Sequence, residues 1–410
     1  IVLGTLRVIC TVILALLARH REKKRLFDQT YRPLVSILIA AYNEQRVIGR
    51  TIRALLASDF QQLEIVVVDD GSKDETFEEV ERLFGDDLRV RVFRQPNNGK
   101  ASALNRAIDN ASGEILVCLD ADTIFAPDTI SKLVRRFADP AVGAVAGNVK
   151  VGNRVNSLTR WQSIEYITSQ NMDRMAFGYL NAITVVPGAV GAWRREAVVE
   201  AGGYLTDTMA EDMDLTWRIR RAGWRIESEN DALAFTEAPD TMKALFKQRF
   251  RWAFGTLQCL WKHRDALGRY GYFGRLMMPA LWLFQIAYQS ISPLVDLQIL
   301  WTVATTIFVW ITGSMLAHDW QPVPQAIASL QQIMTMYLFF FAIEMIGALV
   351  AFSIEKESKK PLVSLLWQRV LYRQLMYGVV LKAIKTAFQG IRTGWGKLER
   401  KGTVTLAHVK

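Results

Sequence analysis

Two carboxylates one residue apart, Asp120 and Asp122, are the side chains best placed for chemistry in this sequence. They close an apolar run, 114–119, whose composition predicts a buried strand. Buried parallel strands present ligand-binding groups at their carboxyl ends. Paired carboxylates repel each other unless a cation neutralises them, and oxygen ligands beside a phosphate site suit Mg²⁺ or Mn²⁺. The alternative is two solvated carboxylates in a strand-to-helix turn, because Asp-x-Asp alone is a weak motif.

Three further groups of polar residues stand at or near the ends of predicted elements. Each group alone has an ordinary structural explanation: a turn, a helix N-terminus that favours acids, or one face of a surface helix. Their order along the chain, together with the Asp-x-Asp pair, is what makes them informative. The three groups are Asp69 with Asp70, Glu211 with Asp212, and Gln248 with Arg251 and Trp252.

The elements that must position these groups alternate between strand and helix. Continuous apolar runs predict strands, and amphipathic segments between them predict helices. This alternation predicts an α/β fold with a mostly parallel sheet. The expected strands are 34–41, 63–70, 89–94, 114–120, 142–149 and 183–193, and the expected helices are 46–57, 74–84, 99–110, 157–178 and 211–222.

Composition points to a membrane protein. Half of the 410 residues are hydrophobic, and the excess lies in 1–19 and after about residue 276. Residues 1–19 precede a basic cluster, which predicts a membrane span ending in the cytoplasm rather than a cleaved signal peptide. Later spans are expected at 277–295 and 297–316.

The last two hydrophobic segments are 332–354, a third late span, and 362–386, a weaker fourth. The weaker one carries polar residues, which in a membrane usually face a bundle interior or a watery path. The alternative is that 362–386 lies at the membrane interface. The polar residues in question are Gln368, Arg369, Arg373 and Gln374.

The net charge of +10 does not indicate nucleic-acid binding, because no basic array interleaved with aromatic residues occurs. Basic residues cluster at membrane borders, as the positive-inside rule expects. The three cysteines and four histidines show no metal-binding or disulfide spacing. A Walker-type phosphate loop is missing too, so ATP-driven transport has no support.

Taken together and in order, the polar groups resemble those of family-2 glycosyltransferases, in particular the processive, membrane-embedded synthases. The segments 41–44, 98–105 and 147–148 match as well. In pattern, the chain resembles poly-β-1,6-N-acetylglucosamine synthases first, and chitin and hyaluronan synthases next. The resemblance covers nearly the whole chain and implies a Rossmann-like GT-A domain on a helical membrane bundle. One departure is Ala210, where the family often has threonine.

The resemblance implies a role for each matching residue. Asp212 is the expected general base, and Glu211 orients it or contacts the acceptor. Asp122, supported by Asp120, is expected to hold Mg²⁺ or Mn²⁺. The expected nucleotide-sugar ligands are Ala41, Tyr42, Glu44, Asp69, Asp70, Lys100, Asp120 and Arg251. The expected acceptor ligands are Gly188, Gln248 and Trp252.

The resemblance also implies a division of the chain. The cytosolic catalytic domain is expected to act on a UDP-sugar at the inner or plasma membrane, and accessory subunits leave no mark in the sequence. The expected parts are a transmembrane helix at 1–19, a basic linker at 20–33, the GT-A domain at 34–240, amphipathic interfacial helices at 241–275, a bundle of three or four transmembrane helices at 276–390 and a basic cytoplasmic tail at 391–410.

The implied activity is an inverting transfer, with N-acetylglucosamine from UDP-GlcNAc favoured, to a growing β-linked polysaccharide that crosses the membrane. A non-processive enzyme that glycosylates a membrane lipid is the alternative, because such enzymes carry similar motifs. The number of late spans and their polar residues favour the polymer. A third hypothesis is a transporter or receptor whose nucleotide-binding domain performs no reaction.

Overall fold

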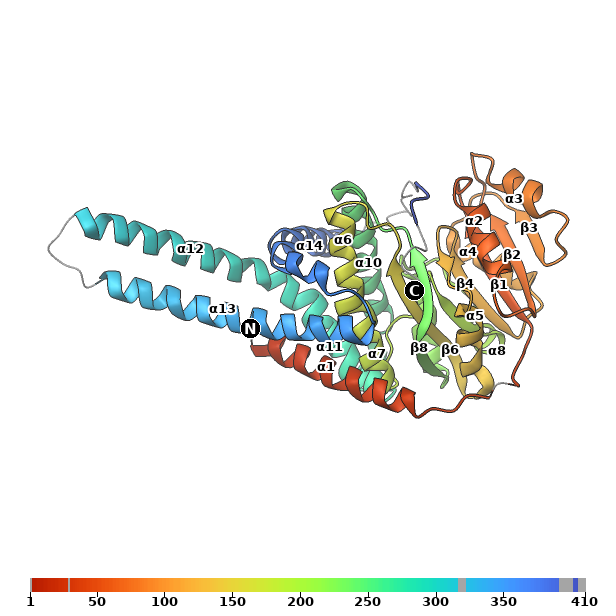
Figure 1. Ribbon diagram of the computed structural model, residues 1–410, viewed down its shortest axis with the longest axis horizontal. Helices are drawn as coiled ribbons and strands as arrows, with labels where there is room; N and C mark the ends of the chain where they lie inside the picture. Colours follow the sequence, from red (N-terminus) through yellow and green to blue (C-terminus); the bar gives the residue numbers. More distant parts are fainter. Residues whose placement is uncertain (1, 29, 316–321, 391–400, 405–410) are drawn as a thin grey trace.

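A computed structural model of the protein describes residues 2–28, 30–315, 322–390 and 401–404 (Figure 1). One end holds a β-sheet flanked by helices, and two long helices, α12 and α13, project from the other end (Figure 1). The N-terminal helix α1 runs beneath the junction of these two parts (Figure 1). The expected tail residues 391–400 and 405–410 lie outside the described residues.

The described residues form one eight-stranded sheet in the order β3-β2-β1-β4-β7-β6-β8-β5. Strands β1 to β4 pair in parallel, and β6 pairs in parallel with β8, whereas β7 is antiparallel to both of its neighbours. This confirms the predicted α/β fold with a mostly parallel sheet. The strands are β1 (Val35–Ala41), β2 (Leu63–Asp69), β3 (Val90–Arg94), β4 (Ile115–Asp120), β5 (Ile124–Phe125), β6 (Val142–Val151), β7 (Gly191–Arg194) and β8 (Arg225–Thr236).

The strand register brings the predicted donor residues to one edge of the sheet. Ala41 lies opposite Asp69 in the β1–β2 pair, and Ala40 lies opposite Asp120 in the β1–β4 pair. The chain runs outward from β1 to β3 and then returns to place β4 on the other side of β1. Such a reversal of strand order opens a crevice at the carboxyl ends, where α/β proteins bind their ligands.

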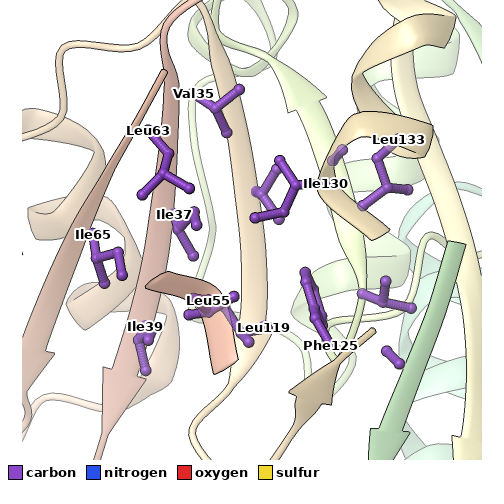
Figure 2. Close-up of a cluster of buried hydrophobic side chains, with 14 of the residues drawn as sticks. Val35, Ile37, Ile39, Leu55, Leu63, Ile65, Leu119, Phe125, Ile130 and Leu133 are labelled. Atoms are coloured by element: carbon purple, nitrogen blue, oxygen red, sulfur yellow. The ribbon is translucent and has the colours of Figure 1, made fainter. Parts of the chain in front are cut away.

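Both faces of the sheet are covered because alternate strand residues point to opposite sides. Figure 2 shows one face, where Ile37, Ile39 and Leu119 pack with Leu55 of α2 and Ile130 of α5. All five are almost completely buried. Each such side chain contributes roughly 1.5–3 kcal/mol through burial, so the crevice rests on a rigid layer.

The helices that follow the sheet strands cover it, and the later ones form the membrane part. A π-helical turn, Tyr166–Asn171, joins α6 to α7. The helices are α1 (Val2–Lys23), α2 (Ile48–Leu56), α3 (Thr76–Phe84), α4 (Lys100–Asp109), α5 (Thr129–Val134), α6 (Ser157–Glu165), α7 (Met172–Tyr179), α8 (Arg195–Glu200), α9 (Glu211–Arg221), α10 (Met242–Lys262), α11 (Met278–Ala280), α12 (Tyr288–Met315), α13 (Pro322–Ile354) and α14 (Leu365–Phe388).

Three helices in the described part of the chain are long and apolar enough to cross a membrane: Val2–Lys23, Phe273–Thr312 and Ile327–Ile354. Two of these are late helices, fewer than the three or four predicted. The spans expected at 277–295 and 297–316 instead form one continuous helical run.

The expected break near Pro293 and Asp296 does not occur because the polar side chain is neutralised. Arg373 of α14 pairs with Asp296 at 2.8 Å, and the Tyr377 hydroxyl donates to it at 2.9 Å. Proline is tolerated in membrane helices when neighbouring groups take up the freed backbone bonds. The helix continues through Pro293 without a break, from Tyr288 to Met315.

The segment predicted as a weaker span, 362–386, forms α14 but is not among these membrane-crossing candidates. Its polar residues contact protein instead of lipid. Gln368 donates to the Trp161 carbonyl at 3.0 Å, and Gln374 donates to Asp296 at 3.1 Å. The side chain of Arg369 lies outside the described residues. Each of these two side chains is therefore satisfied by a protein partner, and the position of the segment relative to a membrane stays a prediction.

Residues 401–404 pack against the part of the protein that holds the sheet. Both oxygens of Glu237 accept backbone bonds, from Lys401 at 2.9 Å and Gly402 at 2.8 Å. Val404 is 2% exposed and packs against Ile124 and Phe235. The chain that leaves α14 therefore returns to the side of the molecule that holds the sheet.

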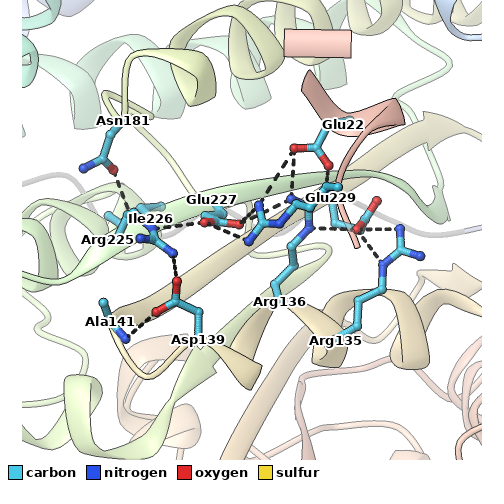
Figure 3. A network of polar contacts seen from close by, with 11 residues as sticks. Glu22, Arg135, Arg136, Asp139, Ala141, Asn181, Arg225, Ile226, Glu227 and Glu229 are labelled. Atoms are coloured by element: carbon cyan, nitrogen blue, oxygen red, sulfur yellow. Dashed lines mark hydrogen bonds and ion pairs between the residues drawn. The ribbon is translucent and has the colours of Figure 1, made fainter. Parts of the chain in front are cut away.

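Ion pairs fasten two of the membrane helices to the sheet. Arg136 is fully buried and pairs with Glu22 of α1 at 2.5 Å and with Glu229 of β8 at 2.8 Å (Figure 3). At the end of α13, Glu355 pairs with Lys150 of β6 at 2.5 Å. A charged side chain so deeply buried is stable only when paired. These contacts therefore fix the sheet relative to α1 and α13.

Candidate active site

The donor side begins with the loop after β1, which is held against the loop after β2. The Asn43 amide donates to the Ser72 hydroxyl at 2.8 Å, and the Glu44 amide donates to the Thr76 hydroxyl at the same distance. Ala41 is buried at the strand end, and Tyr42 begins the loop half-buried. The predicted base-binding segment is therefore held in place by hydrogen bonds from its backbone amides to hydroxyl groups of the neighbouring loop. Its role toward a nucleotide stays a prediction.

Asp69 and Asp70 are both buried at the end of β2. Asp69 pairs with Arg94 of β3 at 3.0 Å. Asp70 accepts from the backbone amides of Asn98 at 2.9 Å and Gly99 at 2.8 Å, and from Gln95 at 2.8 Å. Asp70 thus holds the loop that leads into α4, whose first residue is Lys100.

Lys100 links the donor strand to the predicted general-base helix. Its Nζ atom lies 2.6 Å from Asp120 Oδ1 at the end of β4 and 3.3 Å from Glu211 Oε1 at the start of α9. Burial alone would lower the pKa of Lys100, but the carboxylates of Asp120 and Glu211 outweigh it and raise the pKa above its usual value. Lys100 is therefore a fixed cation between the two halves of the site.

Asp212 is oriented by two backbone amides. The Gly188 amide donates to Asp212 Oδ2 at 3.0 Å, and the Met213 amide donates to Oδ1 at 2.8 Å. Burial raises the pKa of Asp212 above its usual value, although the Lys100 ammonium and both amides act to lower it. Burial likewise raises the pKa of Glu211. A carboxylate with a raised pKa is a better proton acceptor near neutral pH.

Gly188 is a glycine because its neighbours leave no room for a side chain. A Cβ atom there would lie 2.9 Å from Lys100 Nζ and 3.6 Å from Asp212 Oδ2. This close packing explains the glycine, whereas the predicted approach of an acceptor sugar to it stays a prediction.

Ala210 takes its place for a similar reason. A Cβ atom added at Gly255 of α10 would come within 2.7 Å of the Ala210 Cβ atom, so the two small residues let α10 approach the start of α9. The Gln258 side chain of α10 accepts from the Met209 amide at 2.8 Å. The departure from the family's threonine is thus explained by packing.

The C-terminal end of α10 is held by Asp214, a fully buried carboxylate of α9. It accepts from His263 at 2.9 Å, Lys262 at 2.8 Å and Arg218 at 2.8 Å. Burial would raise the pKa of Asp214, but these donors hold it well below its usual value. Arg221 Nη1 lies 3.0 Å from His263 Nδ1, so the ring that contacts Asp214 is itself held from its other side.

The acceptor residues predicted on α10 lie one or two turns before Gly255. Gln248 is buried, Arg251 is half-buried, and Trp252 is 38% exposed, so its indole offers a face to a ligand. The packing of Gly255 against Ala210 joins this helix to the start of α9, and the role of Trp252 toward an acceptor stays a prediction.

Asp120 and Asp122 are suited to a divalent cation by their chemistry. Asp122 is 4% exposed, and the Thr123 hydroxyl donates to its Oδ1 atom at 3.3 Å. Within the described residues, no three His, Cys, Asp or Glu side chains gather to hold an ion alone. Mg²⁺ and Mn²⁺ are commonly held by one or two carboxylates together with substrate phosphates, and two carboxylates are what this strand end offers.

Sequence reasoning missed three residues behind Trp252: Glu165, Arg249 and Tyr372. They come from α6, α10 and α14 and meet through side-chain contacts. Arg249 falls at an unspecified position of the Gln248-x-x-Arg251-Trp252 motif. No sequence periodicity connects the other two to it, so the pattern alone offered no signal.

Comparison with known proteins places the chain in context. The sequence profile described as "Glycosyltransferase like family 2" matches residues 32–255. Poly-beta-1,6-N-acetyl-D-glucosamine synthase of Staphylococcus aureus (strain COL) is 35% identical over 222 residues, 54% of either chain. The synthase of the same name from Staphylococcus epidermidis is 28% identical over 372 residues, 88% of this chain and 85% of the relative. The chain thus spans about half the length of the Staphylococcus aureus synthase.

Among solved structures, the mannosyltransferase PcManGT from Pyrobaculum calidifontis, in complex with GDP-Man and Mn²⁺, superposes with a TM-score of 0.57. It is 24% identical and the match covers 86% of this chain and 97% of that one. At this identity the likeness shows the fold, which is the GT-A-like sheet with attached helices.

Proposed function

The chain belongs to glycosyltransferase family 2, and from that premise we propose that it transfers N-acetylglucosamine from UDP-GlcNAc to a growing β-linked polysaccharide. Relatives named poly-beta-1,6-N-acetyl-D-glucosamine synthase support the choice of sugar. The observation that carries the proposal is the bridge of Lys100 between Asp120 and Glu211. This bridge brings the end of β4 close to the start of α9, which carries the predicted general base.

In the proposed reaction, Asp212 accepts the proton of the acceptor hydroxyl. The acceptor oxygen then bonds to the anomeric carbon as the bond from that carbon to the diphosphate oxygen breaks. A single displacement inverts the anomeric centre, so an α-linked donor gives a β-linked product. The raised pKa of Asp212 suits it to hold this proton.

The departing diphosphate needs positive charge. We assign Arg251 to the diphosphate, where its planar guanidinium can form two parallel bonds. Asp120 and Asp122 would hold Mg²⁺ or Mn²⁺, which when bound supplies Lewis-acid stabilisation of the diphosphate oxygens. The Lys100 ammonium lies between the carboxylates of Asp120 and Glu211 and offsets part of their negative charge before the substrate enters.

The membrane helices support a polymer product through one polar cluster. Asp296 and Arg373 pair between α12 and α14, with Tyr377 and Gln374 beside them. Polar groups within a helical membrane bundle commonly line a pathway. A growing chain is therefore proposed to leave along these helices.

One observation favours the second candidate, transfer of a single sugar to a membrane lipid. Two late helices in the described residues are apolar enough to span a membrane, fewer than the number expected for a bundle that encloses a polymer. A lipid acceptor needs only access from the bilayer.

The experiment uses the full chain in lipid nanodiscs with radiolabelled UDP-sugars and Mg²⁺ or Mn²⁺. The proposal expects labelled polymer from UDP-GlcNAc, sensitive to a hexosaminidase and longer than ten sugars. Extraction of the label into organic solvent as a single-sugar lipid would establish the second candidate. A panel in which UDP-glucose outperforms UDP-GlcNAc would refute the choice of sugar.

A further inference from the structure

We propose that Arg249 is a positioning residue that fixes the indole of Trp252, and that Glu165 and Tyr372 hold Arg249 for this purpose. The inference rests on the proposed function, in which Trp252 receives the acceptor sugar. It adds residues from two other helices to the acceptor site. Arg249 itself contacts no proposed substrate.

Arg249 is held by a closed set of contacts. Its Nη2 atom donates to Glu165 Oε2 at 2.6 Å and to the Tyr372 hydroxyl at 3.0 Å, and its Nε atom lies 3.2 Å from that hydroxyl. Tyr372 in turn donates to the same Glu165 oxygen at 2.5 Å. Because each member contacts the other two, none can rotate alone.

The held guanidinium lies over the indole. Arg249 Cζ is 4.1 Å from the centre of the Trp252 ring, and the Tyr166 ring lies 6.4 Å from the indole on a tilted plane. A cation over an indole face is attracted by the ring, and the attraction strengthens when water is excluded. Arg249 is 1% exposed and Trp252 is 38% exposed, so water is excluded from the guanidinium while part of the indole is exposed to solvent.

Burial makes this arrangement costly unless it is complete. A buried guanidinium needs its counter-ion and well-aligned acceptors, and loss of one partner leaves an uncompensated charge. Lysine would keep the charge but not the flat group that stacks on a ring or the fixed fork of donors. The geometry therefore depends on arginine itself at residue 249.

The three residues come from different parts of the chain. Glu165 ends α6 immediately before the π-helical turn Tyr166–Asn171, Arg249 lies on α10, and Tyr372 lies on α14. A displacement of α14 must therefore move Arg249 and with it the indole. This connects the membrane-proximal helix to the orientation of the acceptor.

The primary test is Arg249→Lys in nanodiscs, with initial rates measured against both UDP-GlcNAc and oligosaccharides of β-linked N-acetylglucosamine. The matched control is Arg264→Lys, since Arg264 also lies over an indole, that of the exposed Trp261, at 4.9 Å. We expect Arg249→Lys to raise the acceptor KM about tenfold while the donor KM stays within about twofold. The control should leave both unchanged.

A double-mutant cycle with Trp252→Ala separates positioning from general damage. If Arg249 acts through Trp252, then Arg249→Lys should change the acceptor KM by less than about twofold once the indole is removed. Independent, multiplying losses would overturn the proposal. So would a donor KM that rises as much as the acceptor KM, or rates equal to the wild type.

A second variant guards against misfolding. Tyr372→Phe removes one hydroxyl and leaves the Arg249–Glu165 pair in place, so we expect a two- to threefold rise in acceptor KM that disappears in the Trp252→Ala background. If Arg249→Lys does not accumulate in membranes, this cycle decides the question alone. Wild-type protein that transfers no sugar from any UDP-sugar would defeat the proposed function, whereas active wild type with the contrary results defeats only the positioning role.

Discussion

The donor edge of the sheet and the acceptor side around α10 are built in different ways. At the donor edge, residues close to one another in strand register, such as Ala40 and Asp120, meet because parallel strands end together. On the proposed acceptor side, Glu165, Arg249 and Tyr372 meet through side-chain bonds between helices that are far apart in the sequence. Strand register therefore positions the donor edge, whereas contacts between packed helices position the proposed acceptor side.

The comparison predicts that the two halves can be disabled separately, with the largest effect from Asp212→Asn. The variant keeps the shape of the side chain but cannot accept a proton, so transfer should fall by about 10²–10⁴-fold. Binding of UDP-GlcNAc, measured by calorimetry, should change little because the donor edge is intact. Lost donor binding or a lower melting temperature would instead mark Asp212 as structural.

Removal of the cation should break the donor half. EDTA is expected to lower transfer by at least about 100-fold, because the diphosphate then departs without Lewis-acid stabilisation. Re-addition of Mg²⁺ or Mn²⁺ should restore the rate in the wild type but not in Asp122→Asn. The independent readout is Mn²⁺ binding by electron paramagnetic resonance, in the presence of UDP. Full activity in EDTA would exclude the metal role of Asp122.

Lys100 lies between the donor edge of the sheet and the start of α9, and its removal should change the pH dependence of the transfer rate. The transfer rate should rise with pH as Asp212 loses its proton, because burial raises the pKa of Asp212, like that of Glu211, above its usual value. Because the Lys100 ammonium lowers both values, Lys100→Met should move this acidic limb to higher pH. Rates measured between about pH 5 and 9 test this. An acidic limb that does not move would contradict the assigned electrostatics.

The smallest effect is expected at the far end of α10. Asp214→Asn weakens three charge-assisted bonds inside the protein and should lower the free energy of unfolding by about 1.5–3 kcal/mol. The matched control is Asp265→Asn, because Asp265 pairs with Arg221 at the surface and should contribute little. Thermal unfolding of the solubilised protein compares the two. Equal melting temperatures would show that Asp214 does not fasten α10 to α9.

The same contrast explains what the sequence could predict. Apolar runs and the acids that end them are local signals, so the strands and the donor edge followed from the pattern. The helix break near Pro293 was predicted wrongly because the partner of Asp296, Arg373 of α14, is 77 residues away. Arg249 escaped notice for the same reason: its importance depends on Glu165 and Tyr372, which no periodicity links to it.

The fastening of α1 and α13 to the sheet, through Glu22 with Arg136 and Glu355 with Lys150, has a consequence for the lipid. A helix whose apolar length exceeds the hydrocarbon thickness tilts to compensate. Since ion pairs hold both helices to the catalytic domain, a change in their tilt rotates the whole domain relative to the bilayer surface. The acyl-chain length of the lipids would then set the angle between the proposed active site and the membrane surface.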